Sequence, residues 1–584
     1  METIKTLTKE VKEFKASSIL TPLFMVLEVI ADTLLPFLMS MIVDEGIYKS
    51  DMNRIIQVGL MMLGCALIGL FAGFMGGFFG AKASTGFARN LRSAMFRNIQ
   101  DFSFAEIDKY STSGLVTRLT TDVTNIQNAY QMILRMFVRA PLSIIFAMGA
   151  AFLINGRIAT VYLVAVIILA VFLVLIMTRT TRYFRQVFEK YDALNESVEE
   201  NLSGIRVVKA YVREDYENNK FIKAVTNLYG LFVKAEGNVV LVAPLMNATV
   251  YACILIISWL GANMIVTGNL TTGELMSLLA YCMNILMSLM MVAMVFVMVT
   301  MSTASAQRIA EVLNQKTSIA EPENPVLEVK DGSIDFDGVD FSYVKGSRAA
   351  VLKDIDLHIR SGEVIGIIGS TGSAKSSLVN LISRLYDVTQ GDVKVGGIDV
   401  RQYDKKTLRD AVAVVLQNNV LFSGTILDNL RWGNKEATEE ECMEACRIAC
   451  ADEFIEQFPD KYHTHIEQGG SNVSGGQKQR LCIARALLKK PKVLVMDDST
   501  SAVDTATEKK IREGMRNAIP GTTKLIITQR VSAVMEADRV IVMDNGRVNG
   551  FDTPENLKKN NTIFREVFEA QQGSGGDFDE KGGQ

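Results

Sequence analysis

Cysteine is scarce in this chain, and the cysteines that are present indicate neither a disulfide framework nor a metal centre. Seven cysteines occur among 584 residues, and no two of them have the C-x-x-C spacing of a metal site. Cys442, Cys446 and Cys450 recur at helical spacing, which is typical of residues that pack on a buried helix face. We therefore expect a reducing compartment and no disulfides.

A strong net charge and a targeting sequence are also missing. The formal net charge is -3 and the basic residues form no dominant cluster, so we expect no nucleic-acid partner. The first residues lack the order of a signal peptide, and there is no organelle transit pattern. We therefore expect that no segment is removed and that the protein is not imported into an organelle.

Long apolar segments are what the chain has in abundance. It is 49% hydrophobic with a mean hydropathy of +0.20, which is too apolar for an ordinary soluble protein. Six segments are each long enough to span a bilayer as a helix, at about 17–43, 53–80, 132–154, 157–178, 239–267 and 274–302. We therefore predict six membrane-spanning helices in contact with a lipid bilayer.

Two of the connections between these segments, 81–131 and 179–238, are long and rich in basic residues. Basic loops stay on the cytoplasmic side of a membrane, so we expect both loops and both termini in the cytoplasm. Apolar positions in the loops recur at helical spacing. We therefore predict that the membrane helices continue as long cytoplasmic extensions.

Polar and thioether side chains within the apolar segments are candidates for a substrate pathway. Glu28 and Asp32 lie one helical turn apart, and carboxylates at membrane depth are costly unless they face a wet cavity or a partner. The alternative is a structural bond between helices. Met287, Met290 and Met294 belong to a methionine stripe that suits varied apolar ligands, although such a stripe is also common in ordinary packing.

The chain changes character around residues 321–325, where two prolines stand in a charged run and the long apolar segments stop. Short strands then alternate with helices, as in an α/β domain with a partly parallel sheet. We predict a transmembrane domain at 1–320 and an α/β domain at 326–572. The Gly-rich polar residues 573–584 are predicted to form a flexible tail.

A phosphate-binding pattern lies near the start of the α/β domain. A β-branched run at 364–368 is followed by a glycine-rich turn and a helical segment, and residues 369–376 match G-x-x-x-x-G-K-[ST] except that Ala374 replaces the last glycine. In such a loop, backbone N–H groups face the polyphosphate, Lys375 reaches its terminal phosphates and Ser376 can hold Mg²⁺. The pattern predicts a P-loop NTPase.

Two further elements complete the predicted site. The apolar strand at 493–496 ends in Asp497, which can complete the shell of Mg²⁺, and Asp498, which could polarise an attacking water. A second helix opens at Ser474, Gly475 and Gly476, and its free N–H groups form another phosphate-binding device. One nucleotide cannot readily use both helix starts of a single chain. We infer that the second serves a nucleotide held by another chain.

With these motifs, the second half resembles the nucleotide-binding domain of ATP-binding cassette (ABC) transporters, and nearly the whole chain resembles an exporter half-transporter. The resemblance implies ATP and Mg²⁺ as ligands, Tyr343 stacked on adenine, and Gln417 as the Q-loop residue that touches Mg²⁺. It implies a signature motif at Ser474, Gly475, Gly476 and Gln477, a D-loop ending at Asp504, and coupling helices near 106–114 and 213–221. The implied nucleotide contacts are Tyr343, Gly369, Ser370, Thr371, Gly372, Ser373, Ala374, Lys375, Ser376, Ser377 and Gln417, and the implied magnesium ligands are Ser376, Gln417 and Asp497.

The sequence departs from this family at its catalytic positions. Asp498 stands where the family has a glutamate, and Gln529 stands where it has a histidine that acts as the switch. A catalytic group displaced by ~1 Å can lower a rate by ~10²-fold. We therefore predict a degenerate site that binds ATP and hydrolyses it slowly. The alternative is that both residues work acceptably here.

An intact signature beside a degenerate P-loop site predicts a heterodimer with a homologous half-transporter that supplies the competent catalytic residues. We expect a subunit of a multidrug-type exporter in a bacterial plasma membrane that moves small amphipathic compounds outward. Two alternatives stay open. The substrate could be a peptide or a lipid, or the chain could be a nucleotide-gated or regulatory subunit that does not pump.

Overall fold

The computed structural model describes residues 2–344 and 349–573, which form two compact units. One unit comprises Met1–Asp101 and Ser111–Gln315, and the other comprises Phe102–Tyr110 and Lys316–Gln584. The short segment 102–110 therefore belongs with the second unit although 205 residues separate it from Lys316 along the chain. The predicted flexible tail lies outside the described residues except for Gly573, which ends a helix.

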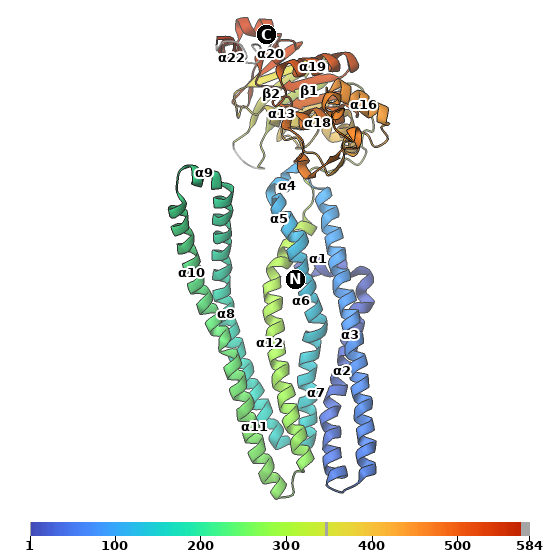
Figure 1. Cartoon of the computed structure of the whole chain (residues 1–584), viewed down its shortest axis with the longest axis vertical. Helices are drawn as coiled ribbons and strands as arrows, with labels where there is room; N and C mark the ends of the chain where they lie inside the picture. The colour runs from blue at the N-terminus through green and yellow to red at the C-terminus, as the bar shows by residue number, and fades with distance from the viewer. Residues whose placement is uncertain (1, 345–348, 574–584) are drawn as a thin grey trace. The chain divides into compact units, whose positions relative to one another are not determined.

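In its described residues the first unit contains helices and turns but no strands (Figure 1). Its long helices are α2 Lys15–Met41, α3 Met52–Gln100, α7 Val138–Ile154, α8 Gly156–Ser203, α10 Glu214–Val240, α11 Val242–Val266 and α12 Thr272–Asn314. Shorter helical turns are α1 Glu2–Thr8, η1 Lys9–Phe14, η2 Ile42–Ile47, α5 Thr112–Thr117, η3 Arg118–Asp122, α6 Val123–Met132, η4 Ile133–Phe137 and α9 Ile205–Ala210. Six helical runs among the described residues are long and apolar enough to cross a membrane, which confirms the six predicted spans.

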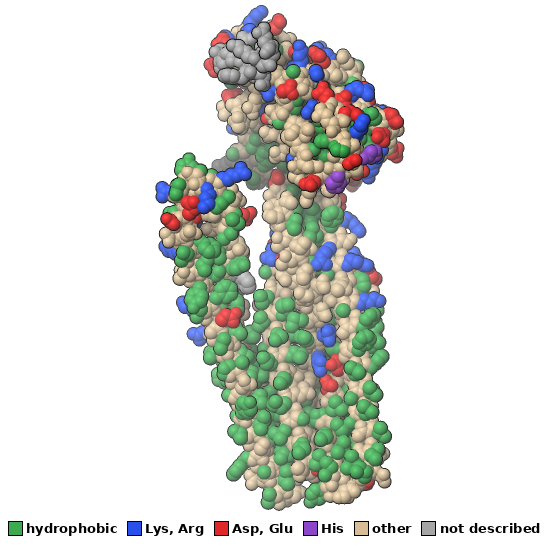
Figure 2. All heavy atoms as spheres, in the orientation of Figure 1, with side chains coloured by type: hydrophobic (Ala, Val, Ile, Leu, Met, Phe, Trp, Pro, Cys, Tyr) green, Lys and Arg blue, Asp and Glu red, His purple; other side chains and the backbone are tan. Residues whose placement is uncertain are grey.

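Local capping explains where several of these helices begin. The side chain of Asp51 accepts hydrogen bonds from the backbone N–H groups of Asn53 and Arg54 at the start of α3, and Asn155 does the same for α8. The helices then continue past the predicted spans, to Gln100 in α3 and Ser203 in α8, so the predicted helical continuation is confirmed. Their place in the cytoplasm stays a prediction. Figure 2 shows hydrophobic side chains (green) crowded over the end of this unit that lies away from α9.

The second unit is the predicted α/β domain, and the larger of its two main sheets is the partly parallel one; the smaller sheet is antiparallel and was not predicted. One has the order β2-β1-β4-β5 and the other the order β12-β11-β3-β10-β9-β6. The strands are β1 Ile334–Phe341, β2 Leu352–Ile359, β3 Val364–Gly369, β4 Gln390–Val395, β5 Ile398–Asp399, β6 Val412–Val415, β7 Gly424–Thr425, β8 His465–Ile466, β9 Val493–Asp497, β10 Thr523–Ile527, β11 Arg539–Asp544 and β12 Arg547–Asp552.

Helices surround these sheets and include α4 from the segment 102–110 (Figure 1). They are α4 Phe104–Tyr110, α13 Lys375–Ile382, α14 Lys405–Ala411, α15 Ile426–Leu430, α16 Glu439–Ile448, α17 Asp452–Ile455, α18 Gly475–Leu487, α19 Thr505–Ala518, α20 Val531–Val534, α21 Pro554–Asn560 and α22 Thr562–Gly573. Three single turns complete the set: η5 Val400–Gln402, η6 Lys461–His463 and η7 Gln468–Gly470.

Among the hydrophobic cores of the described α/β unit, two lie next to the predicted site elements. One joins the two sheets and the inner face of α13, with Phe336, Ile367 and Leu378 fully buried. The other lies among α15, α16, α18 and α19 on the far side of β6 and β9. Cys442, Cys446 and Cys450 are buried in this second core, where burial raises the pKa of each thiol. They pack as hydrophobic residues, as predicted.

Candidate functional site

The predicted site residues follow strands that run parallel in the larger sheet. Ile527 of β10 lies opposite Ile367 of β3 and Asp497 of β9, and Val415 of β6 lies opposite Met496. Because the carboxyl ends of parallel strands meet at one edge of a sheet, the four loops that follow these strands meet there too. The structure thus brings together the P-loop, the loop of Gln417, Asp497 with Asp498, and the loop of Gln529.

The P-loop connects β3 to α13 and is organised around Lys375. The Nζ atom of Lys375 donates hydrogen bonds to the carbonyl oxygens of Gly369 and Ser370, both at 2.9 Å. Burial lowers the pKa of this lysine, while the nearby Asp497 and Asp498 oppose the shift. The first loop position needs glycine, because a Cβ on Gly369 would lie 2.2 Å from the carbonyl oxygen of Met543. These hydrogen bonds therefore fix the ammonium group of Lys375 beside the loop amides that a polyphosphate would contact.

Ala374 occupies the position at which the P-loop pattern has glycine, and its backbone is left-handed. Its φ is 73° and its ψ is 26°, and it stands immediately before the first residue of α13. An L-residue with a Cβ adopts this conformation at a cost of ~1–2 kcal/mol. The departure seen in the sequence thus places local strain at the start of α13, the helix predicted to bind phosphate.

The residues expected to hold Mg²⁺ provide suitable oxygen ligands at this edge. Asp497, the last residue of β9, is buried, and burial raises the pKa of its carboxyl group while a hydrogen bond from Ser376 opposes the shift. Gln417 lies exposed in the loop that follows β6. A carboxylate, a hydroxyl and a carboxamide oxygen fit the preferences of Mg²⁺, which favours hard oxygen ligands and retains several waters.

The two catalytic positions lie beside this set. Asp498 is half-buried, with a left-handed backbone at a φ of 47°, and its pKa is raised by burial and by the neighbouring Asp497. Gln529 is exposed in the loop after β10, and its carbonyl oxygen accepts a hydrogen bond of 2.7 Å from Nε2 of Gln571. The Oε1 atom of Gln571 accepts from the backbone N–H of Val531 at 2.9 Å. The side chain of Gln571, from α22, thus bonds to the backbone of both Gln529 and Val531 in the predicted switch loop. No local sequence pattern predicts this contact.

Tyr343, expected to stack on adenine, lies next to the helix of the P-loop. Its hydroxyl is 2.8 Å from Oγ of Ser377. Its ring makes edge-to-face contacts with two other rings. The centroid of the Tyr343 ring lies 4.8 Å from that of Phe341 and 5.1 Å from that of Tyr386. The tyrosine remains 44% exposed, so one part of the ring is free to contact a base.

The signature residues form the capped start of α18. The Oγ atom of Ser474 accepts from the backbone N–H of Gln477, and the side chain of Gln477 accepts from the N–H of Ser474, which makes a capping box. A Cβ on Gly476 would lie 2.7 Å from the carbonyl oxygen of Ala502, whereas Gly475 has more space. The signature and the D-loop are therefore packed closely against each other.

Gln479 and Asp504 fix the D-loop. The side chain of Gln479 donates to Oγ of Ser501 and accepts from the backbone N–H of Ala502, at 3.2 and 3.0 Å. Asp504 caps α19 by accepting from the N–H of Thr507, and this hydrogen bond lowers the pKa of its carboxyl group. The signature helix is buried in one core and the P-loop helix in the other. In the described part of the chain, no hydrogen bond joins the two motifs.

The two acids predicted at membrane depth are brought together by an arginine of another helix. Nη1 of Arg139 lies 2.8 Å from Oε1 of Glu28, and Nη2 lies 2.9 Å from Oδ2 of Asp32. These contacts favour the structural bond between helices, here α2 and α7, and a role in substrate contact stays a prediction. The arginine could have been recognised from its place inside the predicted span 132–154.

The three methionines of the predicted pathway lie on the exposed side of α12. Met287, Met290 and Met294 are 67%, 42% and 57% exposed. Neighbouring positions such as Ile285, Leu286 and Leu289 are buried against other helices of the same unit. The methionine stripe is therefore free of packing contacts over much of its surface within this chain.

The two expected coupling regions differ in form. Near the first, α4 ends at Tyr110, and Ser111 breaks the helix with a φ of 53° before α5 begins. Near the second, the short helix α9 precedes Arg213, and residues 214–221 form the first turns of α10.

Comparisons with known proteins agree with these features. The family model described as the ABC transporter transmembrane region matches residues 18–290, and the one described as ABC transporter matches residues 352–501. An uncharacterised ABC transporter ATP-binding protein of Mycobacterium tuberculosis is 36% identical over 570 residues, which cover 97% of each chain. A second, from Bacillus subtilis, is 34% identical over 95% of this chain and 96% of its own length.

A solved structure supports the fold. It is described as a bacterial Atm1-family ABC exporter with ATP bound, and it matches with a TM-score of 0.81. The match covers 95% of this chain and 98% of the other at 24% sequence identity. At this level of identity the likeness concerns the arrangement of the helices and strands.

Proposed function

This chain belongs to the ABC transporter family, as an exporter half-transporter with an ATP-binding domain, and we propose that it works in a heterodimer in which its own nucleotide site turns over slowly. The observation that supports the proposal is a contrast at one edge of the larger sheet, between residues suited to bind nucleotide and residues altered at the catalytic positions. Lys375 and Asp497, the proposed phosphate and magnesium contacts, lie at the same edge as Asp498 and Gln529, which replace the glutamate and histidine expected at the catalytic positions.

Slow turnover follows from the chemistry of these two side chains. Asp498 is one methylene shorter than glutamate, so its carboxylate reaches less far from the end of β9 toward a water beside the terminal phosphate. Gln529 is a neutral amide and cannot titrate as histidine does. Lys375 and the loop amides would still bind the phosphates, and bound Mg²⁺ would neutralise phosphate charge. We therefore infer that this site binds ATP and hydrolyses it slowly.

The signature supplies the second half of the argument. The capping box of Ser474 and Gln477 leaves the remaining amides at the start of α18 available for a phosphate group. We propose that this helix start completes the active site of a homologous partner that carries glutamate and histidine at the matching positions. The pair then has one fast and one slow site, and the D-loop of Asp504 lies beside the fast one.

Transport would follow from the difference in ATP affinity between open and closed arrangements of the pair, because a ligand shifts an equilibrium only by that difference. We propose that the substrate is a small amphipathic compound that moves outward along a pathway lined by Met287, Met290 and Met294. We place the protein in a bacterial plasma membrane with both termini and the α/β domain in the cytoplasm, since the long basic connections favour that side.

The test is ATP turnover of the purified pair. Asp498→Glu in this chain should change the rate only modestly, because hydrolysis takes place mainly at the other site. Replacing the matching glutamate of the partner by glutamine should lower turnover by about 10²-fold or more. A large effect of Asp498→Glu together with a small effect of the partner variant would contradict the proposal of one fast and one slow site. Rapid ATP hydrolysis by this chain purified alone as a stable homodimer would contradict it as well.

A further inference from the structure

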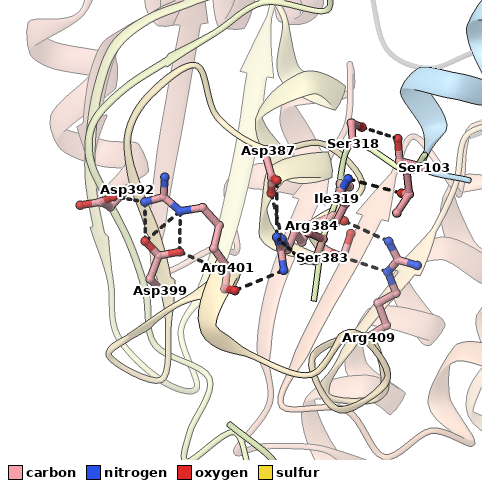
Figure 3. A network of polar contacts seen from close by, with 12 residues as sticks. Ser103, Ser318, Ile319, Ser383, Arg384, Asp387, Asp392, Asp399, Arg401 and Arg409 are labelled. Carbon is pink, nitrogen blue, oxygen red and sulfur yellow. Dashed lines mark hydrogen bonds and ion pairs between the residues drawn. The ribbon is translucent and has the colours of Figure 1, made fainter. Parts of the chain in front are cut away.

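The segment 102–110 is anchored to the α/β unit by a set of buried hydrogen bonds. Oγ of Ser103 lies 2.8 Å from Oγ of Ser318, and Figure 3 shows these two side chains pointing toward each other. The carboxylate of Glu106 accepts from the backbone N–H of Ser103 at 2.9 Å and from that of Ser318 at 3.2 Å. Because Glu106 is buried and multiply bonded, the start of α4 has a defined position on this unit.

Tyr386 contacts the α4 part of the segment 102–110. Its hydroxyl donates a hydrogen bond of 2.8 Å to Oδ2 of Asp108, and its ring lies 6.0 Å from that of Phe104. Both partners project from α4, one turn apart. The tyrosine thus binds α4 through a polar contact and an aromatic contact at the same time.

Tyr386 also contacts Tyr343, the tyrosine predicted to stack on adenine. Its ring meets that of Tyr343 edge to face, with centroids 5.1 Å apart and planes at 86°, and it also contacts Phe341 at 5.7 Å. Tyr343 in turn bonds to Ser377 on α13. One aromatic ring is therefore shared between α4 and the tyrosine expected to stack on the base.

The backbone that carries Tyr386 is held firmly. Arg384 is 5% exposed, and Figure 3 shows it pointing to Asp387, with which Nε makes an ion pair of 2.8 Å. Its Nη2 donates to the carbonyl oxygen of Ala320, and Arg409 donates to the carbonyl oxygen of Arg384 itself, both at 3.0 Å. With its backbone fixed on both sides, Tyr386 can respond to its neighbours mainly through the ring and hydroxyl.

We propose that Tyr386 is a positioning residue that reports the presence of the adenine base to α4. A base stacked on Tyr343 restricts the orientation of that ring, and the edge-to-face contact passes this restriction to Tyr386 and its bond with Asp108. The path runs through the base and bypasses the phosphates. The inference rests on the proposed role of Tyr343, and it is independent of the heterodimer and of slow hydrolysis.

Nucleotide binding to the full-length protein in nanodiscs, without Mg²⁺ so that no turnover occurs, tests the proposal. Coupling between two sites is reciprocal, so Asp108→Ala and Tyr386→Phe, which break the same hydrogen bond from its two ends, should each weaken ATP binding by about fivefold or more. Both should leave the affinity for inorganic tripolyphosphate unchanged. The double variant should be no weaker than either single one.

Two controls distinguish the proposed relay, the path from Tyr343 through Tyr386 to Asp108, from a general loss of protein stability. Tyr403→Phe removes another tyrosine hydroxyl of the same unit, one that donates to the carbonyl oxygen of Val395 at 2.7 Å, and it should leave ATP affinity unchanged. In a Tyr343→Ala background, Asp108→Ala should no longer affect ATP binding. Hydrogen exchange at residues 104–110 should slow on addition of ATP in the wild type and stay unchanged in Tyr386→Ala.

The outcomes are distinguishable. Equal ATP affinity of wild type and Asp108→Ala, or an equal loss of ATP and tripolyphosphate binding, would overturn the relay and leave the proposed function standing. A wild-type chain that binds tripolyphosphate but shows no preference for ATP would remove the role of Tyr343 and the relay with it. Failure to bind either ligand would contradict the proposed function itself.

Discussion

At the scale of single residues, Ala374 has the clearest physical consequence. It combines a left-handed backbone with the presence of a Cβ, in the loop that is proposed to fit closely around phosphate groups. The P-loop nevertheless keeps its local shape, because Lys375 bonds to the carbonyl groups of the same loop. The strain is thus tolerated and is open to direct measurement.

Ala374→Gly should stabilise the protein. Removal of the Cβ relieves ~1 kcal/mol after the greater freedom of glycine in the unfolded chain is allowed for. A gain of this size raises the unfolding temperature of a domain of this length by about 2–4 °C. Thermal unfolding of the full-length protein without nucleotide measures it.

Gly372→Ala is the matched control for this change. Gly372 has a φ of 83° and free space where a Cβ would lie, so alanine there adds left-handed strain without a clash. It should lower the unfolding temperature by a similar amount. If Ala374→Gly were neutral while Gly372→Ala destabilised, the conformation of Ala374 would carry no strain.

At the scale of elements, the bond between α2 and α7 shows how a polar contact specifies helix packing in an apolar environment. Arg139 neutralises two acids that stand one turn apart, so all three charges lose their partners if the helices separate. Removing one member of a buried charge group costs ~3–5 kcal/mol, since the others are left uncompensated. The partial exposure of Arg139 and Asp32 reduces this figure.

Arg139→Ala should therefore lower the yield of monodisperse protein in detergent, as measured by size-exclusion chromatography. The triple variant Glu28→Gln, Asp32→Asn, Arg139→Gln removes every charge of the group and should recover most of that yield. A poor yield of the triple variant together with a normal yield of Arg139→Ala would contradict a structural role. Unchanged folding with lost substrate stimulation of ATP turnover would favour the pathway role.

The capped start of α18 offers a second prediction, because the same chain contains an equivalent cap elsewhere. Ser474→Ala and Thr438→Ala each break a capping box, at α18 and α16, and each should cost ~1 kcal/mol of stability. Only Ser474→Ala should also lower ATP turnover of the heterodimer, by about tenfold or more, because of these two helix starts only that of α18 is proposed to bind phosphate. Equal turnover of the two variants would contradict the proposed role of the signature.

At the scale of the whole molecule, the short segment 102–110 joins a unit that is remote from it in sequence. Burial of Glu106 acts to raise its pKa, but the hydrogen bonds from Ser103 and Ser318 outweigh burial and hold the pKa below the ordinary value of 4.5. A lowered pKa means that the ionised form is favoured in the docked state. Its stabilising effect is present above pH 4.5 and is lost as the pH falls below that value.

Protection of the segment from hydrogen exchange should follow this dependence. After correction for the intrinsic exchange rate, protection of residues 103–110 should be constant from pH 7 to about 5 and fall below about 4.5, by roughly tenfold for a charged hydrogen bond of about 1.5 kcal/mol. Glu106→Gln should show weaker protection with no such fall. A wild-type profile parallel to that of Glu106→Gln would exclude Glu106 as the anchor.

The sequence by itself determined the features that depend on neighbouring residues. Six apolar runs, the phosphate loop before Lys375 and the capped helix start at Ser474 are each complete within a short stretch, because a helix or a strand–loop–helix turn is specified by local periodicity and backbone chemistry. The departures at Ala374, Asp498 and Gln529 were visible for the same reason.

Only the tertiary structure decided which distant side chains meet. Arg139 pairs with Glu28 and Asp32 across more than a hundred residues, Gln571 holds the loop of Gln529, and Tyr386 lies between Asp108 and Tyr343. Such contacts are set by how helices and sheets pack, and a single sequence contains no local pattern for them. The left-handed backbone of Ala374 likewise became visible only once the chain around it was folded, since the strain belongs to the loop as a whole.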